Sequence, residues 1–221
     1  MLTQTQMWAV FDGTVVTLKI ALIAIVFGTL GGILVALGRL SKNKIANSVS
    51  WFYIWFFRGT PMLLQLFMFY YAIPIIYLEI TGSNFVMNAM LCAFITYSLN
   101  SAAYMAEIIR AAIESIDHGQ MEAAKALGMS YHQAMIRIII PQTYKRLVAP
   151  VGNELIILLK DTSLVSTIAL FDLLRTVKTM ASATGNWVYY LYAAAIYLLL
   201  TTILQVLFDK MEVRFGVYEK R

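Results

Sequence analysis

The chain has 221 residues, of which 60% are hydrophobic and 13% charged, with a formal net charge of +5 and a single cysteine. A soluble domain of this length could not bury so much apolar surface, because about half apolar is the usual share. One cysteine excludes an internal disulfide. Basic residues that cluster between apolar runs indicate contact with lipid headgroups rather than nucleic acid.

Five hydrophobic segments predict an all-α integral membrane protein. Each is close to the roughly 20 residues that a helix needs to cross about 30 Å of hydrocarbon. Strands of a membrane barrel would be about half as long and would alternate apolar with polar residues, which these segments do not do. Within one transmembrane domain over residues 1–221, the predicted spans cover residues 15–37, 59–78, 85–106, 147–170 and 186–208.

Positively charged residues gather on one side of these spans. The other side holds only Lys19, near the outer end of the first span, with Arg175 and Lys178. Because Lys and Arg accumulate on the cytoplasmic side, the N-terminus is expected outside and the C-terminus in the cytoplasm. Residues 107–146 then form a long cytoplasmic loop.

The first span carries small residues at helical spacing. Gly28 and Gly32 form a G-x-x-x-G pair, and Ala36 follows four residues later. Small side chains let another helix approach closely in a membrane. We therefore expect a second helix to pack against this face.

The third span contains polar residues at mid-membrane, namely Ser98, Asn100 and Ser101. Ser and Asn in membrane helices commonly hydrogen-bond a neighbouring helix. They could equally line a polar pathway for a solute. The residues alone leave both roles open.

The first part of the long loop predicts a short helix. Asp117 can cap a helix that begins at His118, and Gln120 stands at the capping-box position three residues after the cap. The following Ala-rich run favours helix, and Gly128 offers a C-terminal stop.

A second helix is predicted directly after the first. Ser130 and Gln133 have capping-box spacing, and Pro141 is expected to end the helix. The loop is therefore a helix-turn-helix at the cytoplasmic face. By pattern alone, it could rest on lipid headgroups or dock into a partner protein.

The fourth span holds three ionisable side chains, Glu154, Lys160 and Asp161. Each costs about 2.5–3.5 kcal/mol at mid-span, so they must face protein, water or each other. Glu154 and Asp161 are seven residues apart and lie on one helical face. Lys160 could pair with a carboxylate to hold two helices together, or reach a membrane boundary. No basic residue stands three or four positions from Glu154, which favours a substrate or ion pathway.

The chain shows no pattern for chemistry of its own. There is no G-x-x-x-x-G-K-[ST] phosphate loop and no Ser-His-Asp or Cys-His arrangement. His118 and His132 lack metal-ligand spacing. We expect no catalytic residue, no metal site and no cofactor in this chain. Energy for any transport must then come from a partner or an ion gradient.

The stretch EAAKALGMSYHQAMIRIIIP, residues 122–141, resembles the EAA motif of ATP-binding-cassette importer permeases. That motif is EAA, three residues, Gly, nine residues, then Ile-x-Leu-Pro, and Ile140 stands here where Leu is usual. Its other positions are Glu122, Ala123, Ala124, Gly128, Ile138 and Pro141. The resemblance implies that Glu122, Ala123, Ala124, Gly128 and Pro141 couple the chain to an ATPase.

Three further stretches resemble the polar amino acid uptake permeases of that superfamily: RGTP (58–61), AAYMAEIIRAAI (102–113) and KDTSL (160–164). The resemblance implies separate ATPase subunits that bind ATP and Mg. It also implies a second permease copy or paralogue, an extracytoplasmic substrate-binding protein and a prokaryotic inner membrane. In that family the third and fourth spans line the substrate pathway, which here implies Ser98, Asn100, Ser101, Glu154 and Asp161.

The expected function is therefore that of a permease subunit of an ATP-driven amino acid importer. Two carboxylates on one face without a matched cation favour a cationic amino acid: arginine, lysine or histidine. Permeases of the same class also carry glutamine, glutamate and cystine, and these remain alternative substrates. An ion-driven secondary transporter would show inverted repeats, and none is visible. A membrane scaffold that only binds a partner would explain the loop but not Glu154 and Asn100.

Overall fold

The computed structural model describes residues 3–215, which form helices and turns without a β-strand, as predicted. η1 and η2 are π-helices, and η3 is a 3-10 helix. In chain order the elements are α1 (Gln4–Arg39), α2 (Lys44–Gly59), α3 (Met62–Phe67), η1 (Met68–Ala72), α4 (Ile73–Thr81), α5 (Ala89–Glu114), α6 (His118–Ala126), α7 (Tyr131–Ala134), η2 (Met135–Ile139), α8 (Ile140–Asp161), η3 (Thr162–Ile168), α9 (Leu173–Thr184) and α10 (Val188–Phe215).

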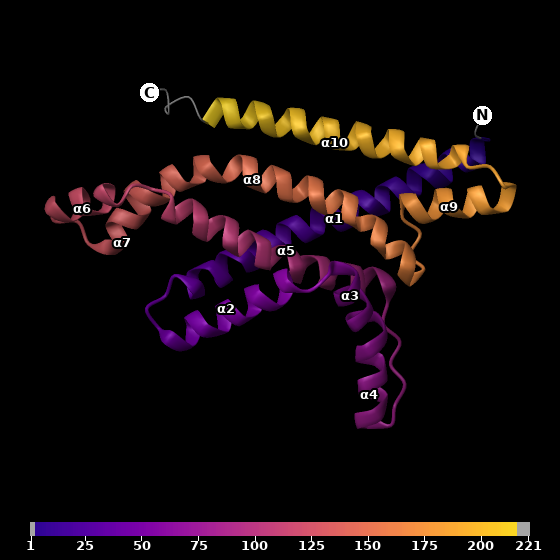
Figure 1. Ribbon diagram of the computed structural model, residues 1–221, viewed down its shortest axis with the longest axis horizontal. Helices are drawn as coiled ribbons and strands as arrows, with labels where there is room; N and C mark the ends of the chain where they lie inside the picture. The colour runs from indigo at the N-terminus through magenta and orange to yellow at the C-terminus, as the bar shows by residue number, and fades with distance from the viewer. Residues whose placement is uncertain (1–2, 216–221) are drawn as a thin grey trace.

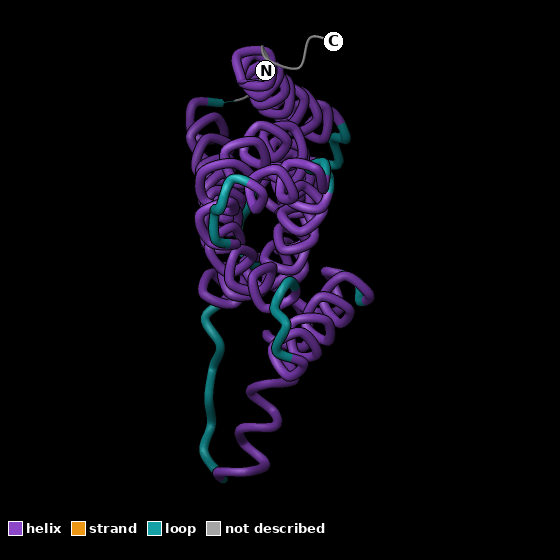
Figure 2. Tube along the Cα trace, turned by 90° about the vertical axis from the view of Figure 1, so that its left-hand side faces the viewer, coloured by secondary structure: helices purple, strands orange, loops and turns teal. Residues whose placement is uncertain are grey.

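The long helices α1, α5, α8 and α10 run lengthwise through the molecule, with α6 and α7 at one end and α9 at the other (Figure 1). The largest core cluster lies where α1, α5 and α8 meet, around Ile20, Tyr97 and Leu158. The segment from α3 to α4 leaves this body sideways as an arm (Figures 1 and 2). Neither η1 nor α4 contains a buried residue, so the chain itself covers little of the arm.

Helix packing relies on glycines at several close contacts, of which three bear on the body of the molecule. A Cβ on Gly28 would lie 2.4 Å from Ser101 Oγ, and one on Gly32 would lie 2.6 Å from Met105 Cβ, so α1 and α5 approach closely. The predicted approach of a second helix at this pair is confirmed. At the other side of the body, a Cβ on Gly152 would lie 2.4 Å from Phe208 Cγ, which brings α8 and α10 equally close.

Replacing Gly28 with valine is expected to destabilise the body. The added carbons would occupy the space of the Ser101 side chain, and overpacking of this kind costs about 1–3 kcal/mol. Thermal unfolding of the detergent-purified protein measures this loss. Leu34→Val on the same helix is the matched control, because Leu34 is 72% exposed. Equal melting temperatures for Gly28→Val and the control would contradict the packing argument.

Four helices among the described residues are long and apolar enough to cross a membrane: Gln4–Arg39, Met62–Thr81, Ala89–Glu114 and Val188–Arg214. They correspond to the first, second, third and fifth predicted spans. The fourth, 147–170, is not confirmed. α8 is more charged than the other long helices, since it carries Lys145, Arg146, Glu154, Lys160 and Asp161. The regular α-helix also ends at Asp161, and η3 follows it.

The second predicted span, 59–78, is only part of a longer helical segment that is interrupted once. It is preceded by the aromatic helix α2, which the sequence analysis missed and which Asn43 caps by accepting from the N–H of Ile45 and Ala46. Thr60 then leaves the helix with φ −114° and ψ 143°, the extended backbone that a following proline favours. Pro61 opens α3, so the segment is interrupted at Thr60 and Pro61.

The turn between α6 and α7 follows the prediction closely. Asp117 caps α6 by accepting from the N–H of Gly119 at 2.7 Å. The end of α6 is a Schellman motif, in which the N–H of Gly128 donates to Lys125 O and the N–H of Met129 to Ala124 O. Gly128 has φ +80°, a left-handed conformation that glycine adopts without strain. Both boundary predictions, Asp117 and Gly128, are confirmed.

Two details of the same loop were predicted wrongly. Ser130 and Gln133 form their capping box, but Gln120 does not complete one, because its Oε1 instead accepts from Gln142 Nε2 at 3.5 Å. Pro141 does not end the second helix. Here η2 provides a wider turn, with the N–H of Ile140 bonded to Met135 O, and Pro141 falls in the first turn of α8. α7, η2 and α8 therefore form one uninterrupted helical rod.

Candidate functional site

A cavity of about 450 Å³ lies at the break between α2 and α3, where these helices face α5 and α8. The interruption at Thr60 and Pro61 forms one side of this cavity, and the face of α8 that carries Glu154 and Asp161 forms another. Its lining residues are Arg58, Gly59, Thr60, Pro61, Met62, Asn100, Tyr104, Glu154, Ile157, Leu158 and Asp161. Three of the five predicted pathway residues, Asn100, Glu154 and Asp161, therefore line one space.

The broken helix leaves backbone carbonyls that two amide side chains satisfy. Gln65 is 1% exposed, and its Nε2 donates to Phe57 O at 2.8 Å and Thr60 O at 3.0 Å. Asn100 Nδ2 donates to the same Phe57 O at 3.1 Å and to Gln65 Oε1 at 2.9 Å. Unpaired carbonyls would be costly inside a membrane protein. Asn100 thus braces the break and also lines the cavity.

The two carboxylates of α8 stand at different depths of the cavity. Glu154 is 5% exposed, and Asp161 is partly buried. Seven residues of α-helix separate their Cα atoms by about 10 Å along the axis. Tyr97 of α5 fixes the end of α8, because its hydroxyl donates to the backbone oxygen of Asp161 at 2.6 Å. The acidic groups are therefore spaced along the wall of the cavity.

Arg58 adds a cation that the sequence analysis did not place in this site. It lies in the last turn of α2, and its Cζ lies 5.3 Å from the centre of the Tyr104 ring. Its Nη1 is 3.7 Å from Glu107 Oε2. Arg58 therefore lines the same cavity as the two carboxylates of α8, while its ion pair is with Glu107 and not with Glu154 or Asp161. The spacing along α8 does not reveal Arg58, because this residue belongs to α2 and reaches the cavity only through the tertiary fold.

The remaining polar residues of the predicted pathway are not part of the cavity lining. Ser101 is fully buried against Gly28 of α1, and neither Ser98 nor Ser101 lines the cavity. Lys160 is exposed and does not line it either. Within residues 3–215 the ion pairs join Arg58 and Arg110 to Glu107 and Glu114, so a Lys160 ion pair with Asp161 is not formed.

The cavity is thus suited to a small molecule that carries both a negative and a positive charge, because it presents one guanidinium, two carboxylates and a phenol ring. It offers no nucleophile with an adjacent base. Among the described residues, no group of three His, Cys, Asp or Glu side chains could hold a metal ion.

The predicted coupling residues divide between the surface and the interior. Glu122, Ala123 and Pro141 are exposed, whereas Ala124 is 1% exposed and packs inside the chain. Ala124 cannot contact a partner from that position. Leu127 at the end of α6 is 82% exposed and Tyr131 at the start of α7 is 64% exposed, and the sequence analysis singled out neither. An apolar, exposed α6 end suits docking into a protein groove.

Comparison with known proteins identifies the family. Residues 28–217 match the family described as binding-protein-dependent transport system inner membrane component. The "Probable amino-acid permease protein YxeN" of Bacillus subtilis is 41% identical over 200 residues, covering 89% of this chain and 87% of that protein. The arginine transport system permease protein ArtQ of Bacillus subtilis is 38% identical over 196 residues, covering 88% and 87%. A relative from Rickettsia felis, 38% identical over 84% of this chain and 83% of its own length, is named for glutamine transport.

The fold agrees with these relatives. A crystal structure of an amino acid ABC transporter with histidines superposes with a TM-score of 0.87 at 35% identity, covering 97% of this chain and 100% of that one. The family match and these similarities extend over the cavity and over α6. The chain therefore belongs to the binding-protein-dependent transport system inner membrane components, as an amino acid permease of an ATP-binding-cassette importer.

Proposed function

We propose that this permease carries a cationic amino acid (arginine, lysine or histidine) and binds it in the cavity between α2, α5 and α8. The observation that carries the proposal is the set of charges in the cavity: one cation, Arg58, and two acids, Glu154 and Asp161. A cationic amino acid has the complementary set, one carboxylate and two cations. Glutamine, which has one carboxylate and one cation, would leave a cavity acid without a partner.

The spacing of the charged groups also suits this ligand class. Arg58 would hold the α-carboxylate, since a guanidinium can bind both its oxygens. Glu154 and Asp161 lie about 10 Å apart along α8, and an extended arginine or lysine carries its two cations at opposite ends. One acid would then face the α-ammonium and the other the side-chain cation.

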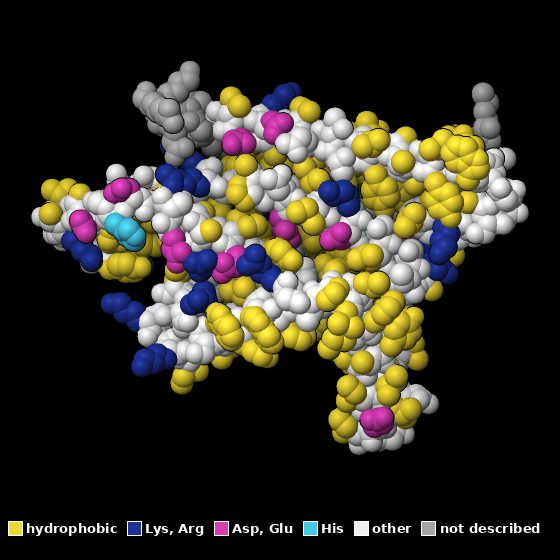
Figure 3. Space-filling view, viewed as in Figure 1, with side chains coloured by type: hydrophobic (Ala, Val, Ile, Leu, Met, Phe, Trp, Pro, Cys, Tyr) yellow, Lys and Arg dark blue, Asp and Glu magenta, His cyan; other side chains and the backbone are white. Residues whose placement is uncertain are grey.

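The proposed assembly places α6 against a separate ATPase subunit that binds ATP and Mg. A second permease copy or paralogue completes the membrane unit, and a binding protein delivers the amino acid at the α9 end. The charge distribution supports this orientation: on the face shown, most dark blue side chains lie towards the α6–α7 half (Figure 3). We place the N-terminus outside and the C-terminus in the cytoplasm of a prokaryotic cell, with α8 as a fifth, protein-shielded span.

The permease–ATPase complex purified without binding protein provides the test, because a binding protein would impose its own specificity. Ligand-induced thermal stabilisation is measured over a concentration series of amino acids. Arginine or lysine is expected to stabilise the complex at lower concentration than glutamine. Equal or tighter binding of glutamine would overturn the cationic assignment. It would leave the permease function untouched.

Glu154→Gln is expected to weaken arginine binding by about 10- to 100-fold, because a hydrogen bond to a charged group contributes about 1.5–3 kcal/mol. The change keeps the shape of the side chain and removes only its charge. Glutamine binding should change less, and this difference between ligands is the measured quantity. Asp209→Asn is the matched control, since Asp209 is an exposed acid outside the cavity. If Glu154→Gln weakened the binding of arginine and of glutamine equally, Glu154 would not determine specificity.

A further inference from the structure

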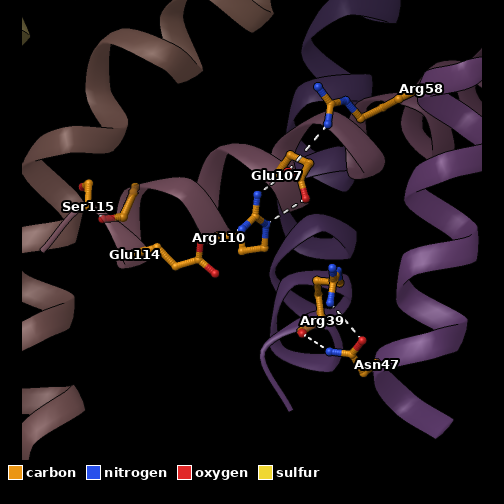
Figure 4. A network of polar contacts seen from close by, with 8 residues as sticks. Arg39, Asn47, Arg58, Glu107, Arg110, Glu114 and Ser115 are labelled. Atoms are coloured by element: carbon orange, nitrogen blue, oxygen red, sulfur yellow. Dashed lines mark hydrogen bonds and ion pairs between the residues drawn. The ribbon is translucent and has the colours of Figure 1, made fainter. Parts of the chain in front are cut away.

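A ladder of alternating charges leads from the cavity along α5 towards the α6 end of the molecule (Figure 4). Arg58 at the edge of the cavity faces Glu107, Glu107 faces Arg110, and Arg110 faces Glu114. Three of these four residues belong to α5, and Arg58 belongs to α2. The contact of Arg58 with Glu107 is therefore the step of the ladder that joins two helices.

The contacts of Glu107 are unequal. Arg110 holds it with two short hydrogen bonds, Nε to Oε1 at 2.9 Å and Nη2 to Oε2 at 2.8 Å. Arg58 Nη1 stands 3.7 Å from Oε2, beyond hydrogen-bond distance. Both oxygens of Glu107 are thus bound to Arg110, and Arg58 is attracted without being fixed. Arg58 can leave Glu107 without leaving that carboxylate unpaired.

Arg58 is free to respond to a ligand in other respects as well. Its side chain is 42% exposed, and it lines the cavity. The nearby Arg39 could not take its place, because its Nη1 donates to Asn47 Oδ1 at 2.9 Å and so ties α1 to α2 (Figure 4). Tyr104, one turn before Glu107 on α5, holds its ring beside the Arg58 guanidinium. The guanidinium therefore lies between a fixed acid on α5 and the ligand space.

We propose that Glu107 is a positioning residue that competes with the carboxylate of the substrate for Arg58. The inference rests on the proposed binding of an amino acid carboxylate by Arg58. In the empty cavity, Glu107 holds Arg58 towards α5. An arriving carboxylate offers two oxygens in place of one distant contact, and Arg58 turns to it. Substrate binding thereby weakens the contact between Arg58 of α2 and Glu107 of α5. Because this contact must be given up, Glu107 lowers the affinity of the cavity for the substrate.

Glu107→Gln removes the competitor and is expected to tighten arginine binding by about 1.4- to fivefold, because a partly exposed ion pair is worth about 0.2–1 kcal/mol. The probe for comparison is agmatine, which is arginine without its carboxylate, and its binding should not change. Glu114→Gln is the matched control, since it removes an acid of the same ladder that contacts Arg110 and not Arg58. Ligand-induced thermal stabilisation of the permease–ATPase complex without binding protein measures all of these affinities.

An Arg58→Met background separates competition from a structural effect. There the gain from Glu107→Gln should vanish, because the two changes act through one contact. The role of Glu107 is overturned by a gain that persists in this background, by an equal gain with agmatine or with Glu114→Gln, or by no gain at all. If the parent complex itself bound agmatine as tightly as arginine, the proposed carboxylate site would fail as well. A parent preference for arginine that Arg58→Met abolishes, combined with no effect of Glu107→Gln, would reject only the role of Glu107.

Discussion

Arg58→Met is expected to reduce uptake of arginine or lysine by about 10- to 100-fold at subsaturating concentration. Methionine keeps much of the length of the side chain but cannot donate to a carboxylate. Losing a charge-assisted contact in a confined site costs about 2 kcal/mol or more, and about 1.4 kcal/mol corresponds to a factor of ten. Uptake of labelled amino acid into liposomes that contain the complete importer measures the loss.

If Arg58 binds the carboxylate of the substrate, two further results are expected. Lys160→Met, which removes an exposed cation outside the cavity, should leave uptake close to that of the parent. The preference for arginine over agmatine should disappear in Arg58→Met and persist in Lys160→Met. Unchanged uptake by Arg58→Met would exclude this guanidinium from the substrate site.

Gly128→Val is expected to separate ATP hydrolysis from transport. Gly128 has φ +80°, and a β-branched residue there is strained by about 1–3 kcal/mol although the space around it is open. Relief of that strain would change the turn that sets α6 against α7. We expect uptake to fall at least tenfold while much of the ATPase activity is retained. Parallel assays of uptake and ATPase activity in the same liposomes measure both.

Two controls distinguish an effect specific to the α6–α7 turn from a general effect of backbone strain. Gly128→Asn should keep most of the transport, because asparagine tolerates the left-handed conformation. Gly185→Val places the same residue at φ +67° after α9, at the opposite end of the molecule, where no ATPase contact is proposed. Normal uptake by Gly128→Val would remove the coupling role assigned to this turn.

The local features of the fold could be predicted from the sequence because they depend on near neighbours. Capping by Asp117, the stop at Gly128 and the Ser130–Gln133 box each involve side chains within a few residues of the backbone groups that they satisfy. The close packing at Gly28 likewise follows from the absence of a side chain. Such features need no knowledge of the tertiary structure.

The break between α2 and α3 could not be predicted with the same certainty. Pro61 signals an interruption, but in the middle of a membrane an interruption is stable only if its carbonyls find partners. Those partners are Gln65 and, from a different helix, Asn100. Arg58 was missed for a related reason, since its place beside Glu107 and Tyr104 depends on how α2 packs against α5.

Pro141 shows how a strong local rule can fail. Proline normally ends a helix because it lacks an N–H and its ring collides with the preceding turn. In η2 the backbone hydrogen bonds span one more residue, and Pro141 falls in the first turn of α8, where its missing donor is tolerated. A π-turn of this kind has no clear sequence signal, so helix termination was the natural expectation.

The unbroken rod from Tyr131 to Asp161 has a mechanical consequence. Gly152 rests against Phe208 of α10 and makes a natural fulcrum close to the cavity. At about 1.5 Å per residue, roughly 30 Å of rod lies on the α7 side of this point and roughly 14 Å on the side that carries Glu154 and Asp161. With Gly152 as the pivot, a displacement at the far tip would be reduced to a little under half at Asp161 and to roughly a tenth at Glu154, with the force increased in proportion.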